Sequence, residues 1–494
     1  MDAINEFLNG IVDAIMTASG EYWTWVLVPL IGFAAVYFTI RTMGVQFRLF
    51  PKMVKSLFEP AGIESNGKKG ISAYQAFSVS AAARVGTGNV IGVSVAISTG
   101  GPGAVFWMWT MGIMVASVGF IESALAQLYK TREGDTFVGG PANYIKYGLG
   151  KAWMAKLFAV VLIITFPTVF LMVQSNTITD AVNSSAEEFG FDIGNIGLLT
   201  VSIILAAIIA LIIFGGLRRI AHVAQLMVPA MALLYLIVGI VMVAINIDQI
   251  GPAFSAIFEG AFGVREFVGG GIGTAIVVGF QRGMFSNEAG MGSSPVAGAT
   301  ASVSHPAKQG LTQAAGVYFD TMIVCTITAM IIMVSQPDLG NSDIEGQLVQ
   351  IAVGDSLGGW SVHVITIVLL FLAFTSCLGN YYYGESNIRF LSKSNTVFTG
   401  YRFWILAMVI IGGVASLDTV WGFADVTMGA MATVNLIAIL MLAPVALKLL
   451  NDYSRQLKDG KDPVFTRDSI DGAGEVPCWD PDADDDRPKT SAGS

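Results

Sequence analysis

A polar, glycine-rich stretch interrupts one of the long apolar runs of this sequence. Residues 279–299 read GFQRGMFSNEAGMGSSPVAGA and lie within the apolar run 272–301, which is long enough to cross a bilayer. The stretch contains Arg282, Glu288 and Pro295. A helix in contact with lipid cannot satisfy ionisable side chains, or the backbone groups that proline and glycine release. The stretch therefore predicts a broken membrane helix that lines a polar cavity.

A second interruption of the same kind lies about two hundred residues earlier in the chain. Residues 80–92 read SAAARVGTGNVIG and break another apolar run with glycines, an arginine and an asparagine. Two hydrophobic segments that glycine interrupts at corresponding positions of two halves indicate a secondary transporter built from inverted repeats. We therefore expect the substrate to bind where the two interruptions meet, near the middle of the membrane.

The composition is that of an integral membrane protein. Of the 494 residues 54% are hydrophobic and 13% charged, and the mean hydropathy is +0.65. Globular proteins carry about a quarter charged residues. The net charge of −9 argues against a nucleic-acid partner, although much of the acidity is concentrated in residues 480–486. Cys325 and Cys377 lie within apolar runs, where we interpret them as small packing residues.

Loop charges predict how the chain crosses the bilayer. Basic residues follow the first span and recur in every loop on that side, whereas Arg265 is the only basic residue in the loops opposite. Lys and Arg mark the cytoplasmic side of the cell membrane, so the N-terminus is predicted outside the cell and the C-terminus in the cytoplasm. About eleven spans are predicted, at residues 23–40, 72–98, 104–128, 157–179, 196–215, 221–245, 272–301, 311–334, 361–383, 401–416 and 421–450.

The order of the spans predicts an inverted repeat. Residues 72–250 and 251–451 each hold five spans and begin with a broken one, and the two halves start on opposite sides of the membrane. The fold class is thus an all-α polytopic membrane protein with a five-plus-five inverted repeat. Residues 1–71 supply an interfacial helix, one extra span and a basic loop. Residues 452–494 are polar and acidic, and are expected to form a disordered cytoplasmic tail.

The first interruption offers groups for both a carboxylate and a cation. A break at Thr87, Gly88 and Asn89 exposes backbone N–H groups at the start of the following half-helix, where a carboxylate can bind. It also leaves free carbonyls at the end of the preceding half-helix, which suit a hard cation such as sodium. The alternative is a glycine-rich seam between packed helices. A seam does not need Asn89 or Arg84, so we favour the binding site.

The second interruption offers partners for the same ligands. Asn287 and the N–H groups next to Ser286 are candidates to hold the substrate. Arg282 and Glu288 lie six residues apart, and the simplest interpretation is an ion pair across the unwound turn that makes both charges tolerable in the membrane. A direct role of Glu288 near the cation or the substrate amine is the alternative.

Two polar features of other spans complete the candidate site. Thr375 and Ser376 are adjacent hydroxyls, and the carbonyl of Leu372 one turn earlier could complete an ion's shell with them. Such hydroxyls more often bond back to their own helix. Gln174 lies within a predicted span, where its amide needs a hydrogen-bond partner from either another helix or the substrate.

The remaining polar residues of the spans have structural interpretations. Glu122 lies late in its span and is expected to anchor a contact near the inner side, and the tyrosines at 381–383 are expected to form an interfacial belt. The sequence has no nucleotide-binding loop, nucleophile elbow or zinc-spaced cysteine pair, so an enzyme is not expected. A sensor would need a sizeable soluble output domain, which the polar tail is too short to form.

With these residues in hand, the sequence resembles the alanine or glycine:cation symporter family, also called sodium:alanine symporters. The most specific match is QRGMFSNEAGMGSSP at 281–295, supported by RVGTGNVIGV at 84–93 and GGPGAVFWMW at 100–109. Shorter matches lie within 37–51 and at 381–385. The resemblance implies a LeuT-like core and sodium-driven uptake of small neutral amino acids, chiefly alanine and glycine.

The resemblance also implies a set of ligand-binding residues. The substrate carboxylate is expected to meet the backbone at Thr87, Gly88 and Asn89, with Gln174, Ser286, Asn287, Ser376 and Asn380 around the substrate. The coupling sodium ion is expected to bind the carbonyls of Ala82, Val85 and Leu372 and the hydroxyls of Thr375 and Ser376.

The chain departs from the family pattern at several positions. Asn380 stands where these proteins usually carry tryptophan, Gln281 replaces a common lysine, and Ala142 replaces a common methionine. A large ring at position 380 would cap a small pocket, whereas asparagine leaves room and a polar group. Two variants of the function stay open: a larger or polar amino acid as cargo, and proton coupling through Glu288. A channel of the same topology is a more distant alternative.

Overall fold

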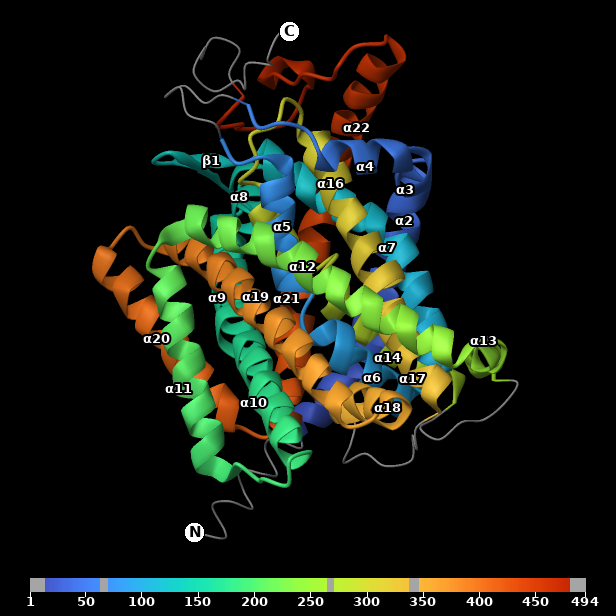
Figure 1. The fold of residues 1–494 in the computed structure, drawn as a ribbon. Helices are drawn as coiled ribbons and strands as arrows, with labels where there is room; N and C mark the ends of the chain where they lie inside the picture. The colour runs from blue at the N-terminus through green and yellow to red at the C-terminus, as the bar shows by residue number, and fades with distance from the viewer. Residues whose placement is uncertain (1–13, 63–69, 264–270, 337–345, 480–494) are drawn as a thin grey trace, which may run out of the picture.

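The computed structural model describes residues 14–62, 70–263, 271–336 and 346–479 of the chain. Within these residues the protein is a bundle of helices, apart from one two-stranded ribbon, β1 (Thr131–Glu133) and β2 (Thr136–Val138), in which Thr131 pairs with Val138 (Figure 1). The first part of the bundle consists of η1 (Trp23–Leu27), α2 (Val28–Arg41), α3 (Val45–Arg48), α4 (Phe50–Leu57), α5 (Ala73–Arg84), α6 (Thr87–Gly100), α7 (Gly103–Leu128), α8 (Pro141–Tyr147), α9 (Ala152–Ile164), η2 (Thr165–Phe170), α10 (Leu171–Glu187), α11 (Gly194–Ile213) and α12 (Gly216–Ile245).

The second part of the chain repeats the pattern of long helices with one interrupted member. It consists of η3 (Ile247–Gln249), α13 (Ile250–Ala261), α14 (Ile272–Asn287), α15 (Ser294–Gly298), α16 (Pro306–Tyr318), η4 (Phe319–Cys325), α17 (Thr326–Ser335), α18 (Leu348–Leu357), α19 (Trp360–Leu391), α20 (Asn395–Val414), α21 (Leu417–Met441), α22 (Ala443–Lys458) and η6 (Arg467–Ser469).

Nine helices in the described part of the chain are long and apolar enough to cross a membrane, which makes this a multi-pass membrane protein. The first of them, Ala14–Arg41, includes the end of the predicted interfacial helix, whose residues 1–13 lie outside the described part. The two predicted broken spans are the shorter pairs α5 and α6, and α14 and α15. The number of spans and the inverted repeat stay predictions.

The first interruption begins after a well-capped helix. Ser72 starts α5 with a reciprocal pair of hydrogen bonds, in which its hydroxyl accepts from Gln75 N at 3.1 Å and its own N–H donates to Gln75 Oε1 at 3.1 Å. The helix ends at Arg84, and the backbone leaves helical geometry at Val85, with ψ +81°, and at Gly86, with φ −140° and ψ −148°. Asn89 Oδ1 accepts from Gly86 N at 3.0 Å, so α6 begins with its own side-chain cap.

Left-handed backbone conformations produce the second interruption. Helix α14 ends at Asn287, and Glu288 takes φ +56°, which is uncommon for a residue with a side chain. Gly290 and Gly292 follow with φ +87° and +82°. A Cβ atom at Gly292 would lie 2.6 Å from Pro141 Cγ, so both conformation and space demand glycine there. The glycines of the sequence motif therefore cause the break.

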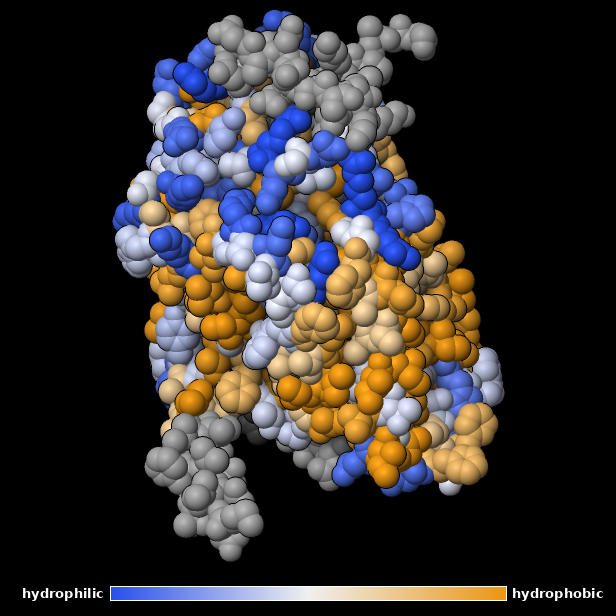
Figure 2. All heavy atoms as spheres, turned by 90° about the vertical axis from the view of Figure 1, so that its left-hand side faces the viewer, coloured by the Kyte–Doolittle hydropathy of each residue, from blue (hydrophilic) through white to orange (hydrophobic). Residues whose placement is uncertain are grey.

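The surface has an apolar band and one hydrophilic end. Large apolar side chains are exposed along α11 and α20, for example Ile203, Leu211 and Phe403. Figure 2 shows this band below a hydrophilic cap, at the end of the molecule where Figure 1 places β1, α4 and α22. An exposed apolar band of this kind is expected of a surface in contact with lipid.

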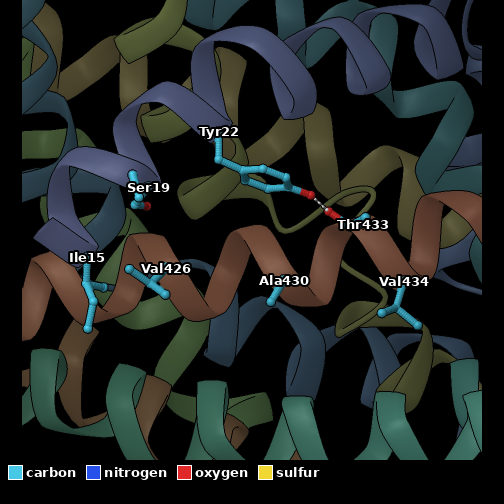
Figure 3. Close-up of a pocket in the computed structure, with 8 residues that line it drawn as sticks. Ile15, Ser19, Tyr22, Val426, Ala430, Thr433 and Val434 are labelled. Atoms are coloured by element: carbon cyan, nitrogen blue, oxygen red, sulfur yellow. Dashed lines mark hydrogen bonds between the residues drawn. The ribbon is translucent and has the colours of Figure 1, made fainter.

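The N-terminal helix packs against α21 and leaves a pocket between them. Tyr22 is hydrogen bonded to Thr433, and Trp23 Nε1 donates to Asp425 O at 3.1 Å. The pocket, of about 440 Å³, lies on this seam, as Figure 3 shows. It is lined by Ile15, Ala18, Ser19, Tyr22, Val426, Ala430, Thr433 and Val434. None of the predicted substrate or sodium residues lines it.

Two sequence-based expectations are wrong. The tyrosines at 381–383 do not form an interfacial belt but are buried inside the bundle, where Tyr401 OH donates to Tyr381 O at 2.7 Å. The reason is that α19 packs against helices on several sides, among them α5, α9, α10 and α20. The predicted disordered tail is ordered from residue 452 to 479, because residues 452–458 belong to α22 and because Phe465 and Trp479 are buried against the helix ends. Residues 480–494 lie outside the described part of the chain.

Candidate functional site

The two interruptions lie side by side, as the sequence predicts. Asn89 Nδ2 in the first break donates to Ser286 Oγ in the second at 3.1 Å. A Cβ atom at Gly88 would lie 2.5 Å from Cδ1 of Phe285, so glycine lets the two backbones approach. Asn89, Gly88 and Ser286 are all buried. The first turn of α6 and the last turn of α14, which lie next to the two interruptions, therefore meet inside the bundle.

Gln174 reaches the first break from α10. Its Oε1 accepts from Thr87 N at 3.2 Å, so its amide contacts a backbone N–H group that was predicted to face the substrate. Thr87 Oγ1 is buried without a hydrogen-bond partner, and so is Asn380 Nδ2 on α19. Buried polar atoms usually have a partner, and a functional site is one explanation when they do not. Both atoms are therefore available to a ligand.

Asn287 is held between the second break and its neighbouring helices. Its Nδ2 donates to Thr321 Oγ1 at 3.1 Å, and its Oδ1 accepts from Ala289 N at 3.0 Å. The Oδ1 contact forms an Asx turn just after α14 and so shapes the chain that follows. The amide of Asn287 is thus engaged by protein groups, and its predicted contact with the substrate stays a prediction.

Four of the five predicted sodium-binding residues are linked by hydrogen bonds, of which the bond from Ser376 to Ala82 joins α19 to α5. The hydroxyls of Thr375 and Ser376 also bond back to their own helix, and Thr375 Oγ1 lies 3.4 Å from Met231 Sδ of α12. Ser376 Oγ lies 2.9 Å from Ala82 O and 3.0 Å from Leu372 O, and Thr375 Oγ1 lies 3.0 Å from Leu372 O. Val85 lies in the break itself. The four residues offer only neutral oxygen atoms, the donors that a hard cation prefers. The donor set therefore fits sodium, which would take over the carbonyls that the two hydroxyls occupy.

Asp320 is a central residue of the site that the sequence interpretation missed. It lies in the π-helical turn η4, its side chain is buried, and its Oδ1 accepts from Asn89 Nδ2 at 2.6 Å. Its Oδ2 accepts from the hydroxyl of Ser286. Among the described residues, no lysine or arginine forms an ion pair with this carboxylate. Asp320 thus joins both interruptions through neutral donors, although a lone acid within the run 311–334 was a usable signal.

Glu122 supports the glycine turn of the second break. Its Oε1 accepts from Gly290 N at 3.2 Å, and its Oε2 accepts from Asn435 Nδ2 at 2.8 Å. Asn435 Nδ2 also donates to Gly290 O at 2.9 Å, and the hydroxyl of Tyr144 donates to Asn435 Oδ1. Glu122 anchors a contact as expected, but that contact is the break itself. Asn435 was not singled out from the sequence.

The expected ion pair between Arg282 and Glu288 is wrong. Arg282 forms a bidentate pair with Asp425 of α21, at 3.1 and 2.7 Å, and lies over the ring of Trp421 at 4.9 Å. Glu288 Oε2 instead accepts from Ser293 Oγ at 2.7 Å. Residues six apart on a helix differ by about two-thirds of a turn, and the left-handed backbone at Glu288 turns its side chain further away.

An aromatic stack lies beside this ion pair. The ring of Phe285 lies 4.6 Å from that of Trp421 and 4.5 Å from that of Phe170. Phe285 is also the residue that touches Gly88 of the first break. Arg282, Phe285 and Trp421 therefore cover one side of the place where the two interruptions meet.

We expect Asp425→Asn to destabilise the protein more than the double variant Arg282→Gln/Asp425→Asn. The single change leaves the guanidinium largely buried without its counter-charge, and breaking a buried pair costs about 3–5 kcal/mol. The two changes together replace the pair with neutral amides. Thermal unfolding of the detergent-solubilised protein measures the difference. Equal loss of Tm in both variants would contradict a structural role of the charge pair.

Two interrupted helices that meet inside a bundle of continuous ones define the class of LeuT-like secondary transporters. A crystal structure of MhsT in complex with L-phenylalanine has this fold, with a TM-score of 0.54 and 13% sequence identity, over 78% of this chain and 99% of that chain. The predicted all-α, LeuT-like fold is thereby confirmed, whereas the five-plus-five inverted repeat stays a prediction.

The chain belongs to the sodium:alanine symporter family, whose model matches residues 6–467. The amino-acid carrier protein AlsT of Bacillus subtilis (strain 168) is 44% identical to it, over 97% of this chain and 99% of that protein. The probable sodium/glutamine symporter GlnT of the same organism is also 44% identical, over 97% of each chain. The motif resemblance is confirmed, and family and fold indicate a symporter rather than an enzyme.

Proposed function

We propose that the protein is a sodium-coupled symporter of small neutral amino acids that works by alternating access across the cell membrane. The observation that carries this proposal is the meeting of the two interruptions beside a set of neutral oxygen donors. Main-chain dipoles at such breaks suit the carboxylate of an amino acid and a monovalent cation. The family to which the chain belongs, and the name of its relative GlnT, support sodium coupling.

The predicted site residues take the following roles in this proposal. The backbone at Thr87, Gly88 and Asn89 holds the substrate carboxylate, and Gln174, Ser286, Asn287, Ser376 and Asn380 surround the amino acid. Sodium binds to the carbonyls of Ala82, Val85 and Leu372 and to the hydroxyls of Thr375 and Ser376. The N-terminus lies outside the cell and the C-terminus in the cytoplasm, so the end with α4 and α22 faces inward.

Ser376 provides a physical link between the ion and the substrate. Its hydroxyl lies 2.9 Å from Ala82 O, on the proposed sodium side. A Cβ atom at Gly86 would lie 2.2 Å from the same hydroxyl, so Ser376 also contacts the turn that presents the N–H groups. An ion that fixes Ser376 and α5 therefore fixes the carboxylate site as well. Binding of either ligand favours binding of the other.

Uptake by proteoliposomes tests the proposal. Labelled alanine and glycine should accumulate with an inward sodium gradient, and only equilibrate without one. A competition panel that includes glutamine, serine and larger amino acids defines the cargo. Accumulation that ignores the sodium gradient would remove sodium coupling, and current far above carrier turnover would indicate a channel.

We expect Ser376→Ala to raise the sodium concentration for half-maximal uptake by about tenfold or more, because a hydrogen bond or ligand contact to a charge contributes about 1.5–3 kcal/mol. Ser94→Ala is the matched control. Ser94 is equally buried, on α6, and its hydroxyl bonds only to Val90 O of its own helix, at 3.0 Å. An unchanged sodium dependence in Ser376→Ala would exclude Ser376 from the ion site.

A second coupling ion is favoured by one specific observation. Asp320 bridges the two interruptions and forms no ion pair in the described part of the chain, although Arg84 interacts with it at longer range. A proton or a bound cation would neutralise a carboxylate in such a place. Proton coupling through Glu288 was left open as an alternative by the sequence, but the geometry favours Asp320, because Glu288 bonds within its own turn to Ser293. The identity of the transported amino acid is likewise open, because the buried amide of Asn380 suits a substrate with a polar side chain.

A further inference from the structure

The C-terminal segment that follows α22 crosses the helix ends at the hydrophilic end of the bundle. After the left-handed turn at Gly460 the chain pairs with the segment before α16. Ser304 Oγ donates to Pro463 O at 2.9 Å, and Phe465 N donates to Ser304 O at 2.9 Å. These two hydrogen bonds fix residues 463–465 against the connection between α15 and α16.

Two aromatic side chains anchor the same segment. Phe465 and Trp479 are almost fully buried, and their rings lie 5.3 Å apart. Trp479 Nε1 donates to Gln127 O at the end of α7, at 3.1 Å, and Tyr129 OH donates to Ala473 O at 2.6 Å. Arg467 N donates to Trp479 O at 2.7 Å, which closes the segment into a compact loop. The segment is therefore part of the protein's core.

Charged contacts hold the near end of the segment. Lys308 Nζ lies 2.7 Å from Asp462 Oδ1 and 3.0 Å from Glu59 Oε2. His305 Nε2 lies 3.2 Å from Asp452 Oδ2, and Lys308 and His305 are buried. These pairs connect the C-terminal segment, the residues after α4 and the start of α16.

The connection that the segment covers is joined to both broken helices. It follows α15, and Ser302 N donates to Ile71 O at 2.8 Å, just before the start of α5. Gln127 Nε2 donates to Gly298 O and to Ala301 O, at 2.7 and 2.9 Å. The inner halves of the two interrupted helices thus share one small network of backbone bonds. The C-terminal segment lies directly against that network.

We propose that residues 461–479 form a C-terminal latch that holds this end of the two broken helices closed. Access from this side requires α5 and α15 to move apart from their neighbours, and the latch adds hydrogen bonds, ion pairs and buried rings that must first be released. The latch therefore slows inward opening. The inference rests on the proposed alternating access, but its test reads the opening itself and not only transport.

Two truncations separate the latch from the rest of the tail. Ending the chain after Gly460 removes residues 461–494, and ending it after Trp479 removes 480–494 and keeps the latch. The reporter is Ala76→Cys, placed at a fully buried position of α5, labelled by a membrane-impermeant maleimide from the α22 side and compared with the same protein lacking the reporter. We expect the first truncation to label several-fold faster than the full chain, and the second to label like the full chain.

Equal labelling of both truncations and the full chain would overturn the latch. If the chain that ends after Gly460 does not fold, the full-length double variant Phe465→Ala/Trp479→Ala removes both aromatic anchors instead. We expect this variant also to label several-fold faster than the full chain. A second experiment locks the latch in place with a disulfide bond. Ser304→Cys with Phe465→Cys, oxidised with copper phenanthroline, should lose uptake and regain it with reductant. Uptake that survives the disulfide would show that the latch need not open. Absence of any amino-acid uptake by the full chain would sink the proposed function alone, since labelling does not depend on it.

Discussion

Gly379→Ala is expected to reduce sodium-driven amino-acid uptake by tenfold or more. A Cβ atom at Gly379 would lie 2.6 Å from the Cβ atom and 2.8 Å from the Cα atom of Ala83. Neither atom can rotate away, so α19 and α5 must separate at the point where Ser376 meets Ala82. Overpacking costs about 1–3 kcal/mol, and about 1.4 kcal/mol corresponds to a factor of ten.

The matched control for this substitution is Gly400→Ala. Gly400 lies in α20, and an added Cβ atom would have no atom within 4 Å, so we expect uptake at the level of the unmodified protein. Initial uptake rates at fixed sodium, normalised to folded protein by size-exclusion chromatography, measure both variants. Wild-type uptake by Gly379→Ala would show that the α5–α19 contact does not define the ion site.

Two substitutions of Asp320 are expected to have clearly different effects on uptake. Asp320→Asn keeps an acceptor for Asn89 and a polar partner for Ser286 but cannot change its charge, so it mimics the protonated carboxyl group. We expect it to retain sodium-driven uptake and to lose the pH dependence of that uptake. Asp320→Ala leaves both neighbours without a partner, which costs about 1–3 kcal/mol for each buried group, and should reduce uptake by more than tenfold.

The measurement compares uptake at acidic, neutral and alkaline external pH, together with a pH-sensitive dye inside the vesicles. Other titratable groups lie close enough to interact electrostatically with Asp320: Arg84 and Glu288 from the broken helices, and Cys325 from the same turn. Glu288→Gln is the control for a neighbouring carboxylate, and should keep the pH profile. A wild-type pH profile and proton signal in Asp320→Asn would rule out Asp320 as the proton-binding group.

The two interruptions could be predicted because their cause is local. Glycine, proline and charge inside an apolar run conflict with a lipid-facing helix wherever the run lies in the fold. The same local logic placed Thr87, Asn89, Ser286 and Ser376 close to one another. Their precise ligands, by contrast, depend on which helices pack together.

Pairings between distant helices were where prediction failed. Arg282 was assigned the acid nearest in sequence, whereas the structure pairs it with Asp425, which lies 143 residues away. Asp320 was passed over because one acid does not disturb the hydropathy of its span. Phe465 and Trp479 anchor the C-terminal segment, but the polar and acidic residues around them led to the prediction of a disordered tail. In each case the deciding contact is non-local, so the sequence pattern carries little trace of it.

The π-helical turn η4 has a consequence for how the span around it presents its side chains. Asn89 Nδ2 lies 2.6 Å from Asp320 Oδ1 and 3.4 Å from Cys325 Sγ, five positions further along. In an α-helix of 3.6 residues per turn, positions five apart point about 140° away from each other. The wider turn brings them onto one face and shifts the phase of α17 relative to α16. The π-helical turn holds about one residue more than an α-helical turn. This extra residue lets a single span present both the carboxylate of Asp320 and the thiol of Cys325 to the amide of Asn89.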